Sequence, residues 1–357
     1  MKLPRLFVIV LLAGAAVTSR TLSAQTPQPV EGDFVTHNFH FRDGESLPDM
    51  KLHYTTYGKP ATDANGKVTN AVLILHGTTG SGHNFTGPNF AGYLFGPGQL
   101  LDATKYFIIL PDGIGHGHSS KPSDGMHAKF PHYDYDDMVA AQHLLVTEGL
   151  KVNHLRLVMG TSMGCMHSWV WLETYPDFMD AAMPLACQPV QIAGRNRMWR
   201  KMITDDIVQD PDYNHGDYTH PLAGMRSVAD LFLIMATSPL QLQKHYPTRD
   251  EADDYLKKYE DRMANDDPND VLYAFDASRN YDPSGKLDEI KAWVMFVNSA
   301  DDQINPPELG IAEREIKKVK RGKFVLLPIT DETVGHGTHS LPKVWHEYLE
   351  ELLQESR

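Results

Sequence analysis

A serine in a glycine-flanked turn is the residue in this sequence most clearly placed to do chemistry. Ser162 occupies the centre of a G-x-S-x-G motif, which follows the apolar run 155–159 and precedes a segment with helical spacing. Strand, G-x-S-x-G and helix form the turn that holds a serine hydroxyl at the top of a sheet, and the glycines are needed because the turn is too sharp for side chains beside it. The pattern predicts that Ser162 is a nucleophile.

A serine hydroxyl becomes nucleophilic at neutral pH when a base takes its proton and an acid orients that base. Asp302 follows the apolar run 292–297 by a short loop, and His336 follows the run 323–329 by another loop. In an open α/β sheet, ligand and catalytic groups gather beyond the carboxyl ends of the strands. We therefore predict a triad in which Ser162 attacks, His336 carries the proton and Asp302 orients His336.

Each of these two partners has a competitor nearby in the sequence. Asp301 could replace Asp302, but we prefer Asp302 because Pro306, four residues further on, is suited to begin the next helix. His339 could replace His336, but we prefer His336 because it lies between two glycines, which suits a tight loop that presents an imidazole. Both choices depend on small shifts of register.

Acyl transfer also needs donors for the negative oxygen of the tetrahedral intermediate. The backbone N–H of Met163, directly after the serine, is one candidate. The backbone N–H of Thr78, in the glycine-rich loop that follows the apolar run 71–75, is the other. A backbone donor tolerates any side chain except proline, so these two residues are predicted from position and not from type.

Nothing in the sequence indicates a cofactor, a metal or a nucleic-acid partner. The pairs His116–His118 and His336–His339 lack a third ligand at a spacing typical of metal sites, and the sequence has neither a P-loop nor a dinucleotide-binding glycine motif. The formal net charge is −13, whereas nucleic-acid binding needs clustered Lys and Arg. We expect a small acyl or ester substrate. The oligomeric state is left open, with a homodimer as one option.

Apolar runs separated by segments of helical spacing indicate parallel β-α-β units with right-handed crossovers. The predicted strands are 50–57, 71–75, 106–110, 155–159, 181–187, 292–297 and 323–329. The predicted helices are 136–150, 227–237, 252–265, 308–319 and 341–353. The fold is predicted to be α/β, with a mostly parallel, doubly wound sheet built from residues 25–190 and 289–357. Residues 191–288 show no strand pattern and are predicted to form an inserted helical cap, and the polar segment 25–45 is predicted to be irregular.

Residues 1–24 have the layout of a secretory signal peptide. Lys2 and Arg5 precede the apolar stretch 6–17, and the segment ends on the small residue Ala24. This stretch is too short to span a bilayer comfortably, so an uncleaved anchor is the less favoured alternative. The mature protein is expected to be periplasmic or secreted and free of the membrane.

The chain has two cysteines, Cys165 and Cys187. Cys165 lies three residues after Ser162, and Cys187 ends the run 181–187, so both are predicted near the same edge of the sheet. An exported protein can pair such cysteines. We favour the alternative, in which two buried and unpaired thiols pack as small apolar groups.

Several further motifs make the chain resemble the homoserine O-acetyltransferases of the α/β-hydrolase superfamily, over about residues 50–353. Besides the serine motif, the resemblance rests on the stretches Tyr54–Gly58, Phe95–Gly98, Asp136–Val139, Tyr175–Asp177, Asp210–Asn214, Gly216–Tyr218 and Asp302–Gln303. Several of these lie outside the motifs common to all α/β-hydrolases. The resemblance implies the α/β-hydrolase fold, a helical lid over the serine and an acyl-enzyme intermediate that is passed to a second substrate.

The chain also departs from that family at the site. The family usually has Ala where this chain has Gly77, a second Gly where it has Cys165, and an Asp, thought to help hold the homoserine amine, where it has Gly337. Arg200 is the candidate for the family's arginine near the substrate carboxylate, although its spacing to Asp210 is off by about one helical turn. Those transferases use acetyl-CoA in the cytoplasm, whereas this chain is predicted to be exported.

These departures favour hydrolysis over transfer. We predict an exported serine hydrolase that acts on an ester, thioester or similar small acyl substrate through an acyl-enzyme. The first alternative is a homoserine O-acetyltransferase-like acyltransferase with an alcohol as acceptor. The second alternative is a non-catalytic α/β-hydrolase-fold binding protein, which a complete triad makes the least favoured.

Overall fold

The computed structural model describes residues 26–357. The predicted signal peptide, residues 1–24, lies outside the described residues. Within residues 26–357, no helix combines the length and the apolar character that crossing a bilayer requires.

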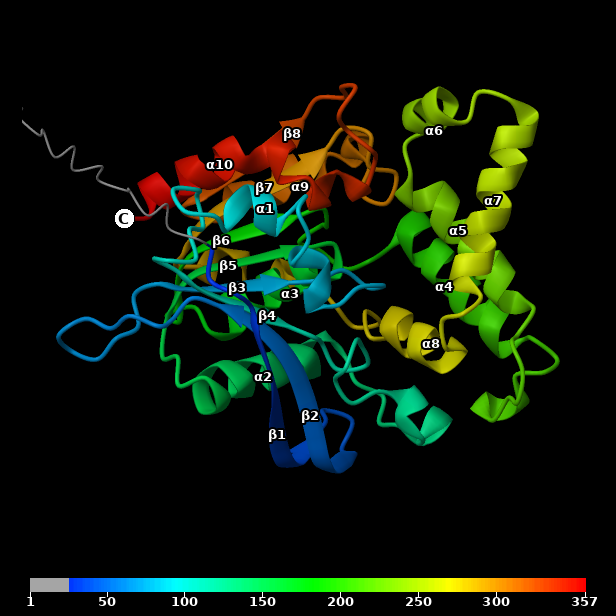
Figure 1. The fold of residues 1–357 in the computed structure, drawn as a ribbon, viewed down its shortest axis with the longest axis horizontal. Helices are drawn as coiled ribbons and strands as arrows, with labels where there is room; N and C mark the ends of the chain where they lie inside the picture. The colour runs from blue at the N-terminus through cyan, green and yellow to red at the C-terminus, as the bar shows by residue number, and fades with distance from the viewer. Residues whose placement is uncertain (1–25) are drawn as a thin grey trace, which may run out of the picture.

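A single sheet of eight strands forms the centre of the protein (Figure 1). The strands are β1 (Val30–His40), β2 (Ser46–Tyr57), β3 (Ala71–Leu75), β4 (Phe107–Pro111), β5 (Leu155–Thr161), β6 (Met179–Leu185), β7 (Trp293–Ser299) and β8 (Gly322–Leu327). They lie in the order β1-β2-β4-β3-β5-β6-β7-β8, antiparallel from β1 to β4 and parallel from β4 to β8. The central strands are continuous apolar runs because helices cover both of their faces. The predicted α/β fold is confirmed.

Two predictions about secondary structure are wrong. The segment 25–45 is not irregular, because β1 lies within it and pairs with β2 from Val30↔Thr56 to His40↔Ser46. This strand is at the edge of the sheet and is mostly exposed or half-buried, so its sequence needs little apolar character. The segment 308–319 is not one helix, because Gly310 adopts a φ of +59° and divides it into the short helix α9 (Ile311–Glu315) and flanking 3-10 turns.

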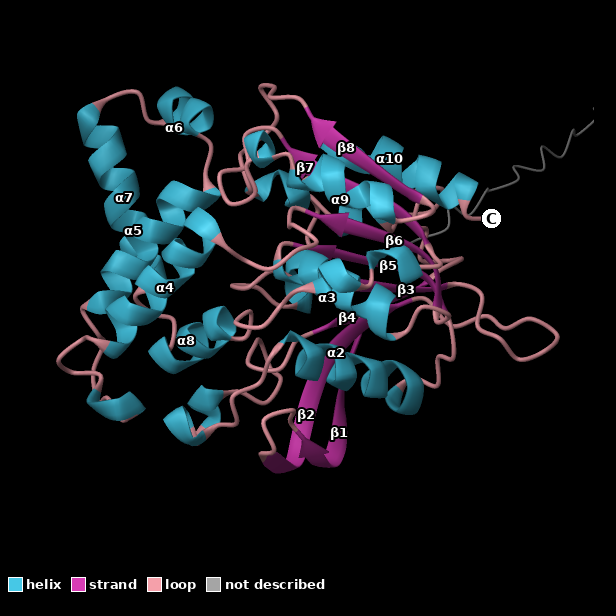
Figure 2. Cartoon of the chain, turned by 180° about the vertical axis from the view of Figure 1, so that it is seen from behind, coloured by secondary structure: helices cyan, strands magenta, loops and turns pink. Residues whose placement is uncertain are grey.

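Helices pack on both faces of the sheet (Figure 2). One face is covered by α2 (Tyr135–Leu144), α3 (Met163–Thr174) and α9, and its core includes the fully buried Trp169. The other face is covered by α1 (Ala91–Leu94) and α10 (Pro342–Glu355), and its core includes the fully buried Trp345. Aromatic side chains of this size fix the helices on the sheet because each buries a large apolar area.

Five helices form a separate cluster beside the carboxyl ends of the strands (Figures 1 and 2). They are α4 (Gly194–Val208), α5 (Gly224–Ala236), α6 (Pro239–His245), α7 (Arg249–Met263) and α8 (Pro268–Asp276). Their apolar faces make a core of their own around Ile203, Val228 and Phe275. We call this cluster the cap. The linker 186–193 connects the end of β6 to the first helix of the cap. The cap lies next to the end of β5, which is followed by Ser162.

Candidate active site

Ser162 lies in a strained turn between β5 and α3. Its φ of 55° is in the left-handed region, which a residue with a side chain adopts at a cost in free energy. The glycines around it are required by space. A Cβ on Gly160 would lie 2.1 Å from the Gly164 carbonyl oxygen, and a Cβ on Gly164 would lie 2.0 Å from the Leu75 carbonyl oxygen. The strain is therefore built into the contact between β5, α3 and β3.

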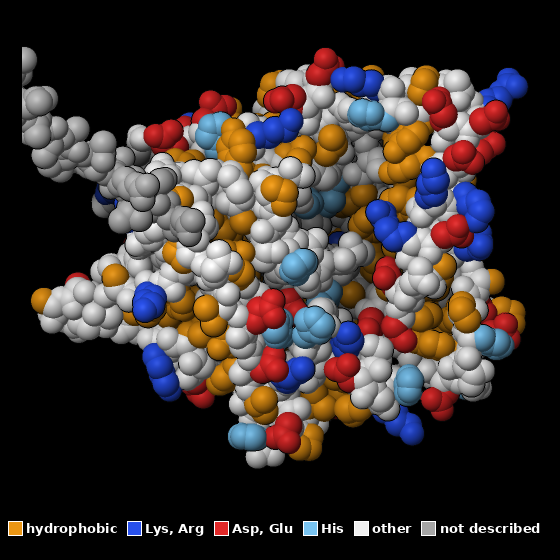
Figure 3. All heavy atoms as spheres, in the orientation of Figure 1, with side chains coloured by type: hydrophobic (Ala, Val, Ile, Leu, Met, Phe, Trp, Pro, Cys, Tyr) orange, Lys and Arg blue, Asp and Glu red, His pale blue; other side chains and the backbone are white. Residues whose placement is uncertain are grey.

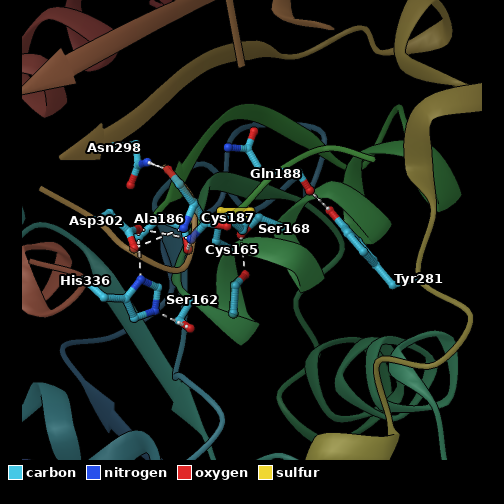
Figure 4. The surroundings of a disulfide bond; sticks show 12 residues. Ser162, Cys165, Ser168, Ala186, Cys187, Gln188, Tyr281, Asn298, Asp302 and His336 are labelled. Atoms are coloured by element: carbon cyan, nitrogen blue, oxygen red, sulfur yellow. Dashed lines mark hydrogen bonds and ion pairs between the residues drawn. A yellow bond between two sulfur atoms is a disulfide. The ribbon is translucent and has the colours of Figure 1, made fainter. Parts of the chain in front are cut away.

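The three predicted triad residues meet at the carboxyl edge of the sheet (Figure 4). His336 Nε2 is 2.8 Å from Ser162 Oγ, and His336 Nδ1 is 2.9 Å from Asp302 Oδ2. These are hydrogen-bond distances, so one ring nitrogen can take the serine proton while the other is held by the carboxylate. Asp302, His336 and Ser162 thus form one continuous hydrogen-bonded chain.

Asp302 is held as a carboxylate although it is completely buried. Its oxygens accept the N–H of Ile304 at 2.8 Å, the N–H of Asn305 at 3.1 Å and the Asn305 side-chain amide at 3.0 Å. Burial by itself raises the pKa of Asp302. The positive charge and hydrogen bond of His336, together with the Asn305 donors, outweigh that effect and lower the pKa below its usual value. A charged acid is what the imidazole needs when it takes up a proton.

The two competitors are nearby but occupy other positions. Asp301 Oδ2 accepts the backbone N–H of Gly335 at 2.9 Å, and the Ser299 hydroxyl donates to its other oxygen. The His339 ring packs edge-on against His336 with 5.0 Å between the ring centroids, and burial lowers the pKa of His339 to about 3. Asp301 therefore anchors the loop that carries His336, and His339 supports the ring from the side.

Both predicted oxyanion donors are near Ser162, Met163 as the next residue in the chain and Thr78 as a residue of the same cavity. Met163 is the first residue of α3, where backbone N–H groups have no partner within the helix. Thr78 lines a cavity together with Ser162 and His336. Among the hydrogen bonds of residues 26–357, neither the Met163 N–H nor the Thr78 N–H has an acceptor. Both amides are free to bind a developing negative oxygen.

His116 holds the loop that carries Thr78, a role that sequence reasoning missed. The ring is buried, with Nε2 2.8 Å from the Thr78 carbonyl oxygen and Nδ1 2.8 Å from the Ile114 carbonyl oxygen. Burial lowers the pKa of His116, which favours the neutral ring. A neutral imidazole carries one N–H and can donate to only one of these two carbonyls, and the tautomer with the proton on Nε2 donates to Thr78. The sequence offered no signal for this contact, because 38 residues separate the two partners.

Replacing His116 by alanine is expected to lower kcat by about 10- to 100-fold, with a smaller change in KM, because a displaced oxyanion donor loses part of the roughly 100- to 1000-fold that such a donor supplies. The measurement is steady-state hydrolysis of p-nitrophenyl butyrate. His118→Ala is the matched control, since His118 is exposed and makes no contact with Thr78. Equal kcat values for the two variants would show that His116 does not position the oxyanion donor Thr78.

Arg200, the predicted substrate-binding residue, is a buried cation at the site. It is 3% exposed, donates to Asn196 Oδ1 at 3.0 Å and to Ser278 Oγ at 3.1 Å, and has no carboxylate partner among the described residues. A buried charge without an opposite charge is unfavourable unless a ligand supplies one or polar groups compensate it. Arg200 borders both of the cavities that meet at Ser162.

Two cavities meet at Ser162 between the core and the cap, where the surface is hollowed (Figure 3). The larger is about 420 Å³, and we call it the linker cavity because residues 186–196 and 304–311 form most of its wall. The smaller is about 230 Å³, and we call it the histidine cavity because it contains Thr78, His336 and His339. Ser162 is therefore accessible from two sides.

Cys165 and Cys187 form a disulfide, with their Cα atoms 5.8 Å apart (Figure 4). The prediction of two unpaired thiols is wrong. The sequence placed both residues near one edge of the sheet, and the parallel pairing of β5 with β6 brings the first turn of α3 against the end of β6. Cys187 also lines the linker cavity. The bond thus joins α3, the helix that follows Ser162, to the start of the linker between β6 and the cap.

Removing this bond is expected to lower the free energy of unfolding by about 3 kcal/mol, from the loop entropy of cysteines 22 residues apart. The measurement is urea unfolding of the wild type and of the Cys165→Ala/Cys187→Ala double variant, each with and without reductant. Reductant should destabilise only the wild type. Two thiols that react in the denatured, unreduced wild type would contradict the bond itself.

The chain is similar to acyltransferases and esterases. The family described as alpha/beta hydrolase fold matches residues 70–214. A probable acyltransferase of Methanothermobacter thermautotrophicus is 30% identical over 77% of this chain and 84% of that protein, and a homoserine O-acetyltransferase of Pelobacter propionicus is 28% identical over 85% and 90%. The solved structure of the acetyl esterase MekB shares the fold, with a TM-score of 0.76, 24% identity and coverage of 92% of this chain and 95% of that one.

These relatives bear on the predicted activity. Since both relatives compared by sequence are named as acyltransferases, the comparison supports the acyltransferase alternative better than the hydrolase that we preferred. The comparison also shows that the chain is an enzyme, and it does not support the alternative of a non-catalytic binding protein. The shared motifs, the fold and these identities together show that the chain belongs to the homoserine O-acetyltransferase-like branch of the α/β-hydrolase superfamily.

Proposed function

We propose that this protein forms an acyl-enzyme on Ser162 from a small ester or thioester and passes the acyl group to water. The observation that carries the proposal is the hydrogen-bonded chain Asp302–His336–Ser162, which ends beside two backbone amides that have no acceptor within residues 26–357. A serine held this way can attack a carbonyl carbon, and the free amides can stabilise the oxyanion that results.

The proposed reaction has two halves. Ser162 Oγ attacks the substrate carbonyl while His336 Nε2 takes its proton, and the Met163 and Thr78 amides bind the oxyanion. His336 then gives that proton to the departing alcohol or thiol, which leaves the acyl-enzyme. Water, activated by the same nitrogen, attacks the acyl carbon, and collapse of the second intermediate releases the carboxylic acid and restores Ser162. Asp302 stays charged and stabilises the imidazolium in both halves.

Transfer to homoserine is the second candidate, favoured by the named relatives. The site itself argues against it. Homoserine carries an ammonium group, and Gly337 stands where the related transferases usually have the Asp that is thought to help hold it. No Asp or Glu is among the described residues that line the histidine cavity. Asp331 and Glu332, the nearest acids in sequence, are exposed and line neither cavity. An ammonium buried there without a partner would cost several kcal/mol.

Export is a further part of the proposal. Its support is the arrangement of charged, apolar and small residues in 1–24 together with the disulfide Cys165–Cys187, since disulfides persist in oxidising compartments. An acyl-CoA supply is not expected there, which favours an ester as acyl donor. Intact mass of the protein from the periplasm or medium of its native host should show a chain that starts near Gln25. A cytoplasmic species that retains Met1 would overturn this part.

The choice between water and homoserine can be tested directly. Purified protein is given p-nitrophenyl acetate alone, and acetyl-CoA with and without homoserine. We expect hydrolysis of the ester and no effect of homoserine on CoA release. The matched variant is Gly337→Asp, because a Cβ at Gly337 would have Val334 Cγ2 as its nearest atom, at 3.3 Å, and can be accommodated. Homoserine that accelerates CoA release by the wild type 100-fold, with slow ester hydrolysis, would establish the transferase instead.

A further inference from the structure

The positions of the donors at Ser162 determine where the parts of an ester must lie. The tetrahedral carbon carries the serine oxygen, the oxyanion, the leaving oxygen and the acyl chain. The oxyanion must face the Met163 and Thr78 amides, and the leaving oxygen must be within reach of His336 Nε2, which protonates it. Thr78 and His336 both line the histidine cavity, and neither lines the linker cavity. The direction that remains for the acyl chain is the linker cavity.

The wall of the linker cavity next to Ser162 suits an apolar chain. It is formed largely by Met166, Cys187, Val190, Ile192, Ile304 and Ile311. The charged side chains Arg195, Arg200 and Glu308 belong to the same wall, and the Arg200 guanidinium is held by Asn196 and Ser278. Leu309, also in that wall, is 53% exposed. The cavity therefore runs from Ser162 along apolar side chains towards solvent.

The linker cavity is much larger than an acetyl group needs. Its volume is about 420 Å³, whereas one water molecule occupies roughly 30 Å³ in the liquid and a methyl group is of similar size. An acetyl group would leave most of this space to water. Each methylene that displaces water from an apolar wall is expected to raise kcat/KM by up to about fourfold, until the chain reaches the open end.

We propose that the linker cavity is the acyl site, that the alcohol occupies the histidine cavity, and that the substrates are esters of uncharged, apolar acyl groups longer than acetyl. The proposal rests on the proposed function, since it needs an acyl-enzyme at Ser162. The chemistry is unchanged: the acyl–oxygen bond of the ester breaks, the alcohol leaves with the proton from His336, and water completes the carboxylic acid.

A series with one leaving group isolates the acyl site. The p-nitrophenyl esters of acetate, butyrate, hexanoate, octanoate and dodecanoate are compared by kcat/KM. Wild-type protein should turn over the hexanoate at least tenfold better than the acetate. Val190→Phe, which narrows the linker cavity, should lower the octanoate-to-acetate ratio at least tenfold. Val190→Ala, which widens it, should move the optimum to longer chains.

Two controls separate the possible failures. Met198→Phe changes an exposed residue of α4 that lines neither cavity, and it should leave the ratio unchanged. Thermal unfolding shows that each variant is folded. If the acetate is the best wild-type substrate and neither Val190 variant changes the ratio, the acyl-site proposal is wrong while the hydrolase stands. If no ester is hydrolysed and Ser162 takes no acyl group, the proposed function is wrong and the acyl-site proposal falls with it.

Discussion

Ser162→Ala is expected to lower the turnover of a p-nitrophenyl ester by about a millionfold, because the remaining amides and cavities cannot form an acyl-enzyme. The same variant should lose covalent labelling by a fluorophosphonate, which forms its adduct with an activated serine. Mass spectrometry of the labelled wild type should place the adduct on Ser162. The reason is geometric, since Ser162 Oγ lies 2.8 Å from the base His336.

Ser168→Ala is the matched control for this experiment. Ser168 lies in α3, the helix that follows Ser162, and is completely buried, but its hydroxyl donates to the Gly164 backbone carbonyl at 2.8 Å and not to a histidine. This variant should keep both labelling and turnover. An adduct on another serine, or a folded wild type that takes no label, would refute the assignment of Ser162 as nucleophile.

Strain at Ser162 gives this assignment a second readout. Ser162 has a φ of 55°. Glycine adopts this backbone conformation without strain, whereas a residue with a side chain adopts it at a cost of about 1 to 3 kcal/mol. Ser162→Gly should therefore be inactive and at the same time more stable than the wild type, as measured by urea unfolding. If Ser162→Gly were inactive because its fold is disrupted, its free energy of unfolding would instead be lower than that of the wild type.

The central strands could be predicted from sequence because both of their faces are buried. The apolar run 71–75 coincides with β3, and all five residues of that strand are buried. The edge strand β1 could not be found in this way, since hydrogen bonding to β2 and not burial holds most of it. The cap helix α4 was missed for a related reason: its polar sequence buries only Trp199, Arg200, Ile203 and Ile207.

The triad could be located from sequence because each member follows a strand, and the ends of parallel strands share one edge. What could not be predicted depends on contacts between loops. The hydrogen bond between His116 and Thr78 and the hydrogen bond between Asp301 and Gly335 each join segments more than 30 residues apart in the sequence. Neither belongs to a sequence motif. For the disulfide, the positions of the two cysteines near one edge of the sheet could be predicted from sequence. The distance between them could not, and that distance decides whether they pair.

The second large effect is expected at Asp302. Asp302→Asn should lower kcat by about 10,000-fold, because an amide in this position favours the wrong tautomer of His336 and cannot stabilise the imidazolium. The fold should survive, since the asparagine oxygen can still accept the backbone N–H groups of Ile304 and Asn305 that Asp302 accepts now. The measurement is kcat for p-nitrophenyl butyrate, with thermal unfolding to check that the variant is folded.

Asp301→Asn is the matched variant, and it separates orientation of the base from support of its loop. Asp301 is also buried and precedes Asp302 directly, but it binds the backbone N–H of Gly335 and not the imidazole. An asparagine oxygen can accept that N–H, so the loss in kcat should be about tenfold or less, from a weaker hydrogen bond. Asp301→Ala removes the acceptor altogether and should cost more, through a displaced His336 loop. If Asp301→Asn instead lowered kcat more than Asp302→Asn, Asp301 would be the carboxylate that stabilises the protonated imidazole. The contact between Asp302 and His336 would then have no catalytic role.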